Sequence, residues 1–428
     1  MKIFLNPEKK DWPPLLQRPE LDYQSLSGKV SAILTEIRLH GDAAVKKYCS
    51  LFDGVDLQDL RVSSPELEQA SDLVSIELKE AIALAKSNIT RFHESQLVSE
   101  HRIETMPGVD CWRQAVAIEK VGLYIPGGTA PLFSTLLMLG IPATIAGCKE
   151  IVVCTPPDKN GNINPVILYV AHLLGIQNVF KIGGVQAVAA MAYGTASVPK
   201  VYKIFGPGNQ YVTCAKQLVN AAGTSIDMPA GPSEIAIFAD ETSTPAFVAS
   251  DLLSQAEHGT DSQVLLVSAS HKVLNQVVKE VELQLEQLPR KEIAAASLRN
   301  SRFVLLDDID QAFEMLNDYA AEHLIIASEN ANPLAERVIN AGSVFLGHYS
   351  PESVGDYASG TNHTLPTNGN AKAYSGVSVD SFVKKITFQQ LSKAGLQNIG
   401  TAVQLMAEAE GLQAHRNAVS IRLTAIKN

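Results

Sequence analysis

The chain has few cysteines, and none of them is paired at a metal-binding spacing. Five cysteines are scattered through 428 residues without a CxxC motif. Such an odd, unpatterned set is typical of a reducing compartment, and it argues against a zinc site built from thiolates. Cys148, Cys154 and Cys214 lie in or beside apolar segments with no activating partner in the sequence, so we interpret them as packing residues rather than nucleophiles.

The common fingerprints of nucleotide-binding and acyl-transfer enzymes are also missing. No GxGxxG, Walker loop or GxSxG elbow occurs. The formal net charge of -10 gives no reason to expect nucleic acid or an anionic membrane as a partner. Residues 121–148 carry no charge, but glycines and prolines interrupt them, so we expect no membrane span. The N-terminus lacks the apolar run of a signal peptide, so we predict a cytoplasmic protein.

What the chain does contain is a repeated pattern of strand, turn and helix. From Val121 onward, eight short β-rich runs each end at a turn and continue into an amphipathic helix. This alternation predicts parallel sheets covered by helices. Eight units can close a single barrel, but the irregular segment from Ile226 to Ser233 divides them four and four. Two open Rossmann-like sheets are therefore favoured.

Three turns in the first four units are rich in glycine. YIPGG, KIGG and FGPGN each follow a predicted strand and precede a predicted helix, where backbone N–H groups can bind a phosphate or pyrophosphate. A single turn of this kind is more often only a tight connection. Three together favour a nucleotide-like ligand at the carboxyl edge of this half.

The second half contains a helix with a polar row. Thr244 at the N-cap, Pro245 at the first helical position and Gly259 at the end delimit it. Gln255 and His258 share a polar face with Asp251, beside the apolar stripe that faces the core. Buried polar groups without partners cost about 1–3 kcal/mol each, so we expect a metal ion and its ligand as partners.

Histidines next to acids or amides recur elsewhere in this half. The Glu322–His323 pair precedes an apolar run at its amino edge, and Asp356 lies in the region 348–378, which has no helical or strand periodicity. A solvated loop is the alternative for each cluster taken alone. Nitrogen and oxygen ligands without thiolates suit a catalytic zinc ion. The candidate ligands are Gln255, His258, Asp356 and His415.

One geometric condition follows for the C-terminal cluster. Glu410 and His415 are five residues apart, which places them about 140° apart around a continuous helix. Both can point into one site only if the helix breaks near Gly411.

Several long motifs resemble the histidinol dehydrogenase family. They are GLYIPGGTAPLFSTLLMLGIPA, KIFGPGNQYVT, IDMPAGPSE, SDLLSQAEHG, EHLI, AGSVFLG, SPESVGDYASGTNHTLPT and AHRNAV. The resemblance runs from about residue 25 to the end. It implies a homodimeric, zinc- and NAD-dependent enzyme that oxidises L-histidinol through bound L-histidinaldehyde to L-histidine with two NAD. It also implies two Rossmann-like domains of aldehyde-dehydrogenase type.

The family's functional residues map onto matching positions of this chain. By resemblance, Gln255, His258, Asp356 and His415 hold zinc, and Glu322 and His323 are the acid–base pair. The resemblance makes Tyr124, Gln186 and Asn209 the NAD contacts. The substrate-binding residues that it implies are Ser233, Gln255, His258, His323, Asp356, His363, Glu410 and His415. Of these, Glu410 and His415 are expected to come from the partner subunit.

The expected organisation has four parts: an N-terminal arm (1–23), a first Rossmann-like domain (24–120 with 232–378), a second one (121–231) and a helical C-terminal tail (379–428). The first domain is expected to carry zinc and substrate, and the second NAD.

Two other classes of protein remain open. A zinc hydrolase would use the His, Asp and Glu cluster but leave the glycine turns idle, and a binding protein with two lobes would bind ligand without turnover.

Overall fold

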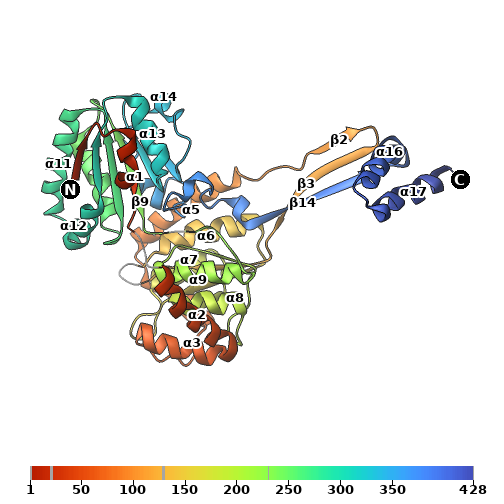
Figure 1. The fold of residues 1–428 in the computed structure, drawn as a ribbon. Helices are drawn as coiled ribbons and strands as arrows, with labels where there is room; N and C mark the ends of the chain where they lie inside the picture. The colour runs from red at the N-terminus through yellow and green to blue at the C-terminus, as the bar shows by residue number, and fades with distance from the viewer. Residues whose placement is uncertain (1, 20–22, 128–130, 230, 428) are drawn as a thin grey trace. The chain divides into compact units, whose positions relative to one another are not determined.

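The computed structural model describes residues 2–19, 23–127, 131–229 and 231–427 (Figure 1). Gly128, the last residue of the YIPGG turn, lies outside them. The chain divides into two compact units, Met1–Ser95 with Ile118–Phe382 and Gln96–Ala117 with Val383–Asn428. Each unit is described by itself below.

The described part of the first unit contains a parallel sheet of six strands, in the order β1-β11-β10-β9-β12-β13. Its central strands β9 and β10 are buried at every position, which agrees with their continuous apolar sequence. Helices α10, α11 and α12 cover one face, and α1, α13 and α14 cover the other. The strands are β1 (Lys2–Leu5), β9 (Glu234–Ala239), β10 (Gln263–Ser268), β11 (Arg302–Leu305), β12 (His323–Ala327) and β13 (Ser343–Leu346). The helices are α1 (Trp12–Leu16), α10 (Pro245–Ala256), α11 (His271–Leu285), α12 (Lys291–Asn300), α13 (Ile309–Tyr319) and α14 (Ala331–Ala335).

The same unit contains a second parallel sheet, whose described strands follow the order β6-β5-β4-β7-β8. Helices α2, α3, α8 and α9 pack in the core on one face, and α4, α5, α6 and α7 pack on the other. The strands are β4 (Lys120–Tyr124), β5 (Glu150–Thr155), β6 (Asn178–Lys181), β7 (Lys203–Phe205) and β8 (Ser225–Ile226). The helices are α2 (Tyr23–His40), α3 (Asp42–Tyr48), α4 (Ser64–Gln69), α5 (Ile76–Glu94), α6 (Phe133–Ala146), α7 (Pro165–Leu173), α8 (Gly184–Tyr193) and α9 (Gln210–Ala221). Two open sheets are therefore confirmed, and the single barrel is excluded.

The N-terminal helices pack on a different sheet from the one expected. The sequence grouped 24–120 with 232–378, but α2 to α5 bury their apolar stripes against the sheet formed by 121–231. The arm is also more integrated than a free extension. Strand β1 pairs in parallel with β11, and Trp12 is buried in the core beneath the six-stranded sheet. An amphipathic stripe predicts a helix, but it does not specify which sheet the helix covers.

The second unit is built on an antiparallel sheet of three described strands, β14 (Val383–Leu391), β3 (Val109–Ala117) and β2 (Arg102–Met106). Helices α16 (Lys393–Ala409) and α17 (Gln413–Lys427) follow it. The helical tail is thus confirmed from Lys393 onward, whereas β14 is a strand. Its Phe388 stacks on Trp112 of β3, with ring centroids 5.4 Å apart, so long-range pairing determines its conformation.

Short elements complete the fold. The region 348–378 contains a helix, α15 (Glu352–Tyr357), and a 3-10 turn, η4 (Asn370–Lys372). A π-helical segment, η2 (Cys49–Asp53), follows α3. The remaining 3-10 turns are η1 (Lys9–Asp11), η3 (Ala70–Leu73) and η5 (Val379–Phe382). None of the helices in the described ranges combines the length and the apolar character needed to cross a membrane.

Candidate functional site

The amino edge of the six-stranded sheet carries buried acids. Glu234 is the first residue of β9, and Glu322 directly precedes β12, the parallel neighbour of β9. Their side chains are buried, and the backbone N–H of Glu234 donates to Oε2 of Glu322 at 3.0 Å. The Glu322–His323 pair therefore lies in the interior and not in a solvated loop. Burial raises the pKa of Glu322 to about 8, although His323 opposes this shift.

His323 stands among three carboxylates. Its Nδ1 lies 3.8 Å from Oε2 of Glu322 and 3.8 Å from Oε1 of Glu352, and its Nε2 lies 3.5 Å from Oδ1 of Asp356. These separations exceed good hydrogen-bond distances, so the ring is held mainly by charge and packing. Burial disfavours the charged ring, but Glu352, Glu322 and Asp356 outweigh it and raise the pKa of His323 to about 10.

Three side chains of types that can bind a metal converge beside this pair. His258 follows the end of α10, and Glu352 and Asp356 lie one turn apart on α15. One ligand atom from each of these three residues lies within 4.8 Å of the other two. Burial works against the charge on Asp356, but the nearby His323 and the electrostatic influence of His363 and His258 lower its pKa, so it offers an ionised oxygen. An imidazole nitrogen and carboxylate oxygens are a donor set that fits a zinc ion.

Gln255 joins this group through Glu352. Its side chain is buried, and its amide nitrogen and oxygen are assigned so that both find a partner: the NH₂ then donates to the Glu352 carboxylate, and the oxygen accepts from the Glu234 N–H at 3.3 Å. Gln255 thus contacts Glu352, one ligand atom of which lies within 4.8 Å of ligand atoms of His258 and Asp356, and the ligand assignment of Gln255 stays a prediction. Asp251, one turn before Gln255, is half-buried, and burial raises its pKa to about 7.

The substrate-binding candidates Ser233 and His363 lie in the same unit. They line a small cavity of about 40 Å³ together with Glu322 and the glycines of the FGPGN turn. Nδ1 of His363 lies 2.9 Å from the Asp356 carbonyl oxygen, and its Nε2 lies 3.1 Å from Oγ1 of Thr135 on α6. His363 therefore links α15 to α6, a helix that packs on the five-stranded sheet.

The three dinucleotide candidates lie at the carboxyl edge of the five-stranded sheet, and each has a local role. The hydroxyl of Tyr124, at the end of β4, accepts from the Gly184 N–H at 3.1 Å. Gln186 is buried in the first turn of α8, and its Nε2 donates to Asp53 at 3.1 Å. Asn209 is exposed at the N-cap of α9, where its Oδ1 accepts from the N–H groups of Tyr211 and Val212 at 3.0 and 3.1 Å.

Glu410 and His415 belong to the second unit, in which both side chains are exposed. Helix α16 ends at Ala409, Gly411 has a φ of +72°, and α17 begins at Gln413. The helix therefore breaks at Gly411, which is the condition set by the spacing of these two residues.

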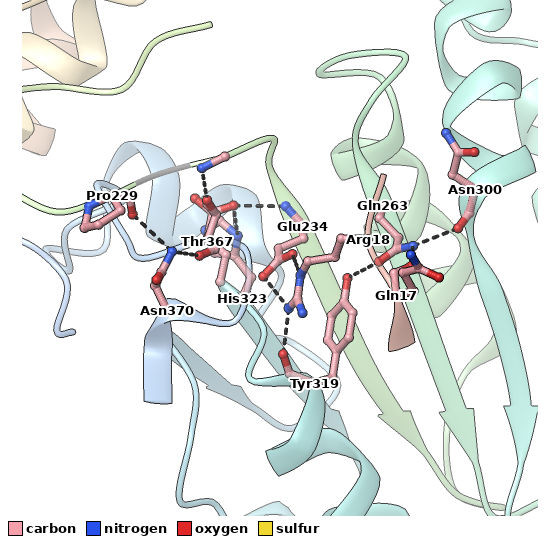
Figure 2. Close-up of polar contacts among 12 residues, drawn as sticks. Gln17, Arg18, Pro229, Glu234, Gln263, Asn300, Tyr319, His323, Thr367 and Asn370 are labelled. Atoms are coloured by element: carbon pink, nitrogen blue, oxygen red, sulfur yellow. Dashed lines mark hydrogen bonds and ion pairs between the residues drawn. The ribbon is translucent and has the colours of Figure 1, made fainter. Parts of the chain in front are cut away.

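Two features of the site were missed in the sequence. Glu352 lies four residues before Asp356, the spacing of one helical face, within a region whose loop-like composition hides the short helix α15. Figure 2 shows the other feature, the ion pair of Glu234 with Arg18 from the N-terminal arm. These two residues are 216 positions apart, so no local pattern signals their contact.

The fold places this chain in a class of α/β proteins built from two open parallel sheets. The chain matches an acetylating aldehyde dehydrogenase from Geobacillus thermoglucosidasius with a TM-score of 0.50, and the match covers 86% of this chain and 98% of the other. At 13% identity this similarity establishes the fold alone.

Closer relatives identify the family. The family model for histidinol dehydrogenase matches residues 16–423. Histidinol dehydrogenases from Bacteroides thetaiotaomicron and Bacteroides fragilis are 61% and 58% identical over 100% of both chains. The crystal structure of histidinol dehydrogenase from Elizabethkingia anophelis matches this chain with a TM-score of 0.98 at 55% identity. The match covers 100% of this chain and 99% of the other.

The chain therefore belongs to the histidinol dehydrogenase family. It is an oxidoreductase that acts on an alcohol group in histidine biosynthesis. This membership overturns both alternatives left open by the sequence, the zinc hydrolase and the binding protein without turnover.

Proposed function

We propose that this chain oxidises L-histidinol to L-histidine in two steps at one site, with zinc and NAD. The observation that carries the proposal is the convergence of His258, Glu352 and Asp356 within 4.8 Å of one another, beside the buried Glu322–His323 pair. An acid–base pair next to a nitrogen–oxygen metal cluster is the arrangement that a metal-assisted alcohol oxidation requires.

Gln255, His258 and Asp356 would hold the zinc ion, together with His415 of the partner subunit. Bound zinc would supply a fixed positive charge that orients the substrate, and two molecules of NAD would accept the two hydrides. The rest of the substrate would contact Ser233 and His363, with Glu410 of the partner subunit. The protein would thus be a homodimer with shared sites.

In the first step, His323 accepts the hydroxyl proton of the alcohol as hydride leaves, and an aldehyde results. The carboxylates that raise the pKa of His323 would be partly neutralised by a cation at Asp356 and His258. The pKa of His323 would then fall toward the range in which an imidazole can accept a proton. The aldehyde stays bound between the two oxidations.

In the second step, Glu322 takes a proton from a water molecule that attacks the aldehyde carbon. The hydrate loses a second hydride, and the carboxylic acid forms, so each histidinol consumes one water and two NAD. A pKa of about 8 places Glu322 close to neutrality, where a carboxyl group can both accept and release a proton.

The dinucleotide would bind at the five-stranded sheet through Tyr124, Gln186 and Asn209. Strand order reverses between β4 and β7, and ligands of open parallel sheets bind outside the carboxyl ends at such a switch point. Tyr124 ends β4, and Asn209 follows β7. We therefore assign NAD to residues 121–231 and the metal and substrate to residues 232–378, in a cytoplasmic enzyme.

Metal analysis combined with product stoichiometry tests this proposal. We expect close to one zinc per chain and two NADH formed per histidinol consumed, with histidine as the product. One NADH per histidinol with aldehyde released would contradict the two-step site. Full turnover by protein freed of metal would contradict the zinc assignment.

A further inference from the structure

The N-terminal arm delivers a buried guanidinium behind the Glu322–His323 pair. Arg18 follows α1, and its Nε and Nη2 bind the two carboxylate oxygens of Glu234 at 2.5 and 2.8 Å. The side chain of Glu234 is 3% exposed and that of Arg18 is 16% exposed. A bidentate ion pair this deep has a defined geometry, and a surface contact does not.

Arg18 also holds the segment that leads into the pair. Its Nη2 donates to the Tyr319 carbonyl oxygen at 2.6 Å, and its guanidinium lies 4.0 Å from the centroid of the Tyr319 ring (Figure 2). Tyr319 is the last residue of α13, three positions before Glu322. Between them Ala320 has a φ of +52°, a strained value for a residue other than glycine. A strained turn needs contacts on both sides to keep one conformation.

Both contacts of Arg18 help to fix the position of Glu322. One runs through Glu234, whose backbone N–H donates to Oε2 of Glu322 at 3.0 Å. The other runs through Tyr319 and the turn at Ala320. Tyr319 is itself fixed, because its hydroxyl donates to Gln263, whose amide donates to the carbonyl oxygens of Gln17 and Asn300. The arm, the turn and the strand end thus form one hydrogen-bonded block.

We infer that Arg18 is a positioning residue for the second oxidation, and that the N-terminal arm fixes the Glu322 carboxylate through Glu234 and Tyr319. This inference rests on the proposed role of Glu322 in activating water. Displacing a catalytic group by about 1 Å can cost as much as a hundredfold in rate, so loosening the block is expected to slow one step selectively.

The test compares Arg18→Met with the parent enzyme, each given histidinol or histidinaldehyde with NAD. We expect kcat with histidinaldehyde to fall by roughly tenfold or more, with KM and the alcohol step within about twofold. Arg18→Lys keeps a cation and should lie closer to the parent. Lys9→Met is the matched control, because this arm cation pairs with Glu314 at the surface.

A second variant separates positioning from folding. Arg18→Met leaves Glu234 buried without its partner, which can unfold the protein, whereas Arg18→Met with Glu234→Gln removes both charges. We expect this folded double variant to keep the slow aldehyde step. If the double variant recovered the parental rate of the aldehyde step, Arg18 would only neutralise the charge of Glu234, and the inference would be overturned. A parental rate of the aldehyde step in folded Arg18→Met protein would overturn it as well. Glu322→Gln is measured alongside. If it leaves the aldehyde step intact, the proposed role of Glu322 fails, whatever Arg18 does.

Discussion

The two parallel sheets of the first unit carry their candidate site residues at opposite strand ends. The six-stranded sheet gathers Glu234, Glu322 and His323 at its amino edge, beside the group of His258, Glu352 and Asp356 that could hold a metal. The five-stranded sheet places Tyr124 and Asn209 at its carboxyl edge, next to glycine turns. Two halves of one architecture thus offer two different chemistries.

Helix ends account for this difference. Helices that follow parallel strands have their N-termini at the carboxyl edge, where free N–H groups favour anions, and their C-termini at the amino edge, where free carbonyls favour cations. Asn209 caps the start of α9, whereas Gln255 lies in the last turn of α10 and His258 just beyond it. The proposed cation at one edge and the proposed pyrophosphate at the other therefore agree with the polarity of the backbone.

The proposed difference between the two sheets would be wrong if the amino edge of the six-stranded sheet did not bind a metal. We expect His258→Asn to lose zinc and to lower activity by more than about a hundredfold, since even residues behind metal ligands can cost 10–100-fold. His271→Asn, an exposed histidine on α11, is the matched control and should keep both. Metal content of purified protein and NADH formation measure the effect. Full zinc occupancy in His258→Asn would remove it from the ligand set.

A variant of Glu352 with a smaller expected effect tests which residues are ligands, because Glu352 is as close to His258 and Asp356 as a ligand would be. We propose that Glu352 instead orients Gln255 and His323, with which it is in contact. Glu352→Gln should therefore retain zinc and lose activity by about tenfold, the scale of a residue behind the ligands. Zinc loss equal to that of His258→Asn would make Glu352 a ligand.

Local patterns predicted the eight strand–turn–helix units because each has its own apolar period. They did not predict β1, β3 or β14, whose conformation depends on partners far along the chain. Strand β1 pairs with β11, which lies some 300 residues away, and its own residues are mostly exposed. The packing of α2 on the five-stranded sheet has the same cause, since an apolar face does not specify its partner.

The same limit applies to the site. Gln255 lies in the last turn of α10 and His258 two residues past its end at Ala256, so their proximity follows from the sequence, although the helix ends before the predicted Gly259. Asp356 is a candidate from its residue type and its place in the region 348–378, and the spacing of Glu352 from Asp356 matches one helical face. The contact of Arg18 with Glu234 joins two distant segments, and only the folded chain reveals it. Local spacing thus predicts which side chains share a helix or strand, whereas the tertiary fold determines which distant residues contact them.

The smallest effects are expected at the carboxyl edge, where Asn209 has two roles that one pair of variants can separate. Its Oδ1 accepts from the first N–H groups of α9, so Asn209→Ala should cost about 1 kcal/mol of stability as a lost N-cap. Asp at this position keeps the cap and adds a negative charge where a pyrophosphate is expected to lie. Asn209→Asp should therefore retain stability in thermal unfolding and raise the KM for NAD severalfold, more than Asn209→Ala does. If Asn209→Asp left the KM unchanged, Asn209 would be only a helix cap, and the dinucleotide would have to lie elsewhere along this edge.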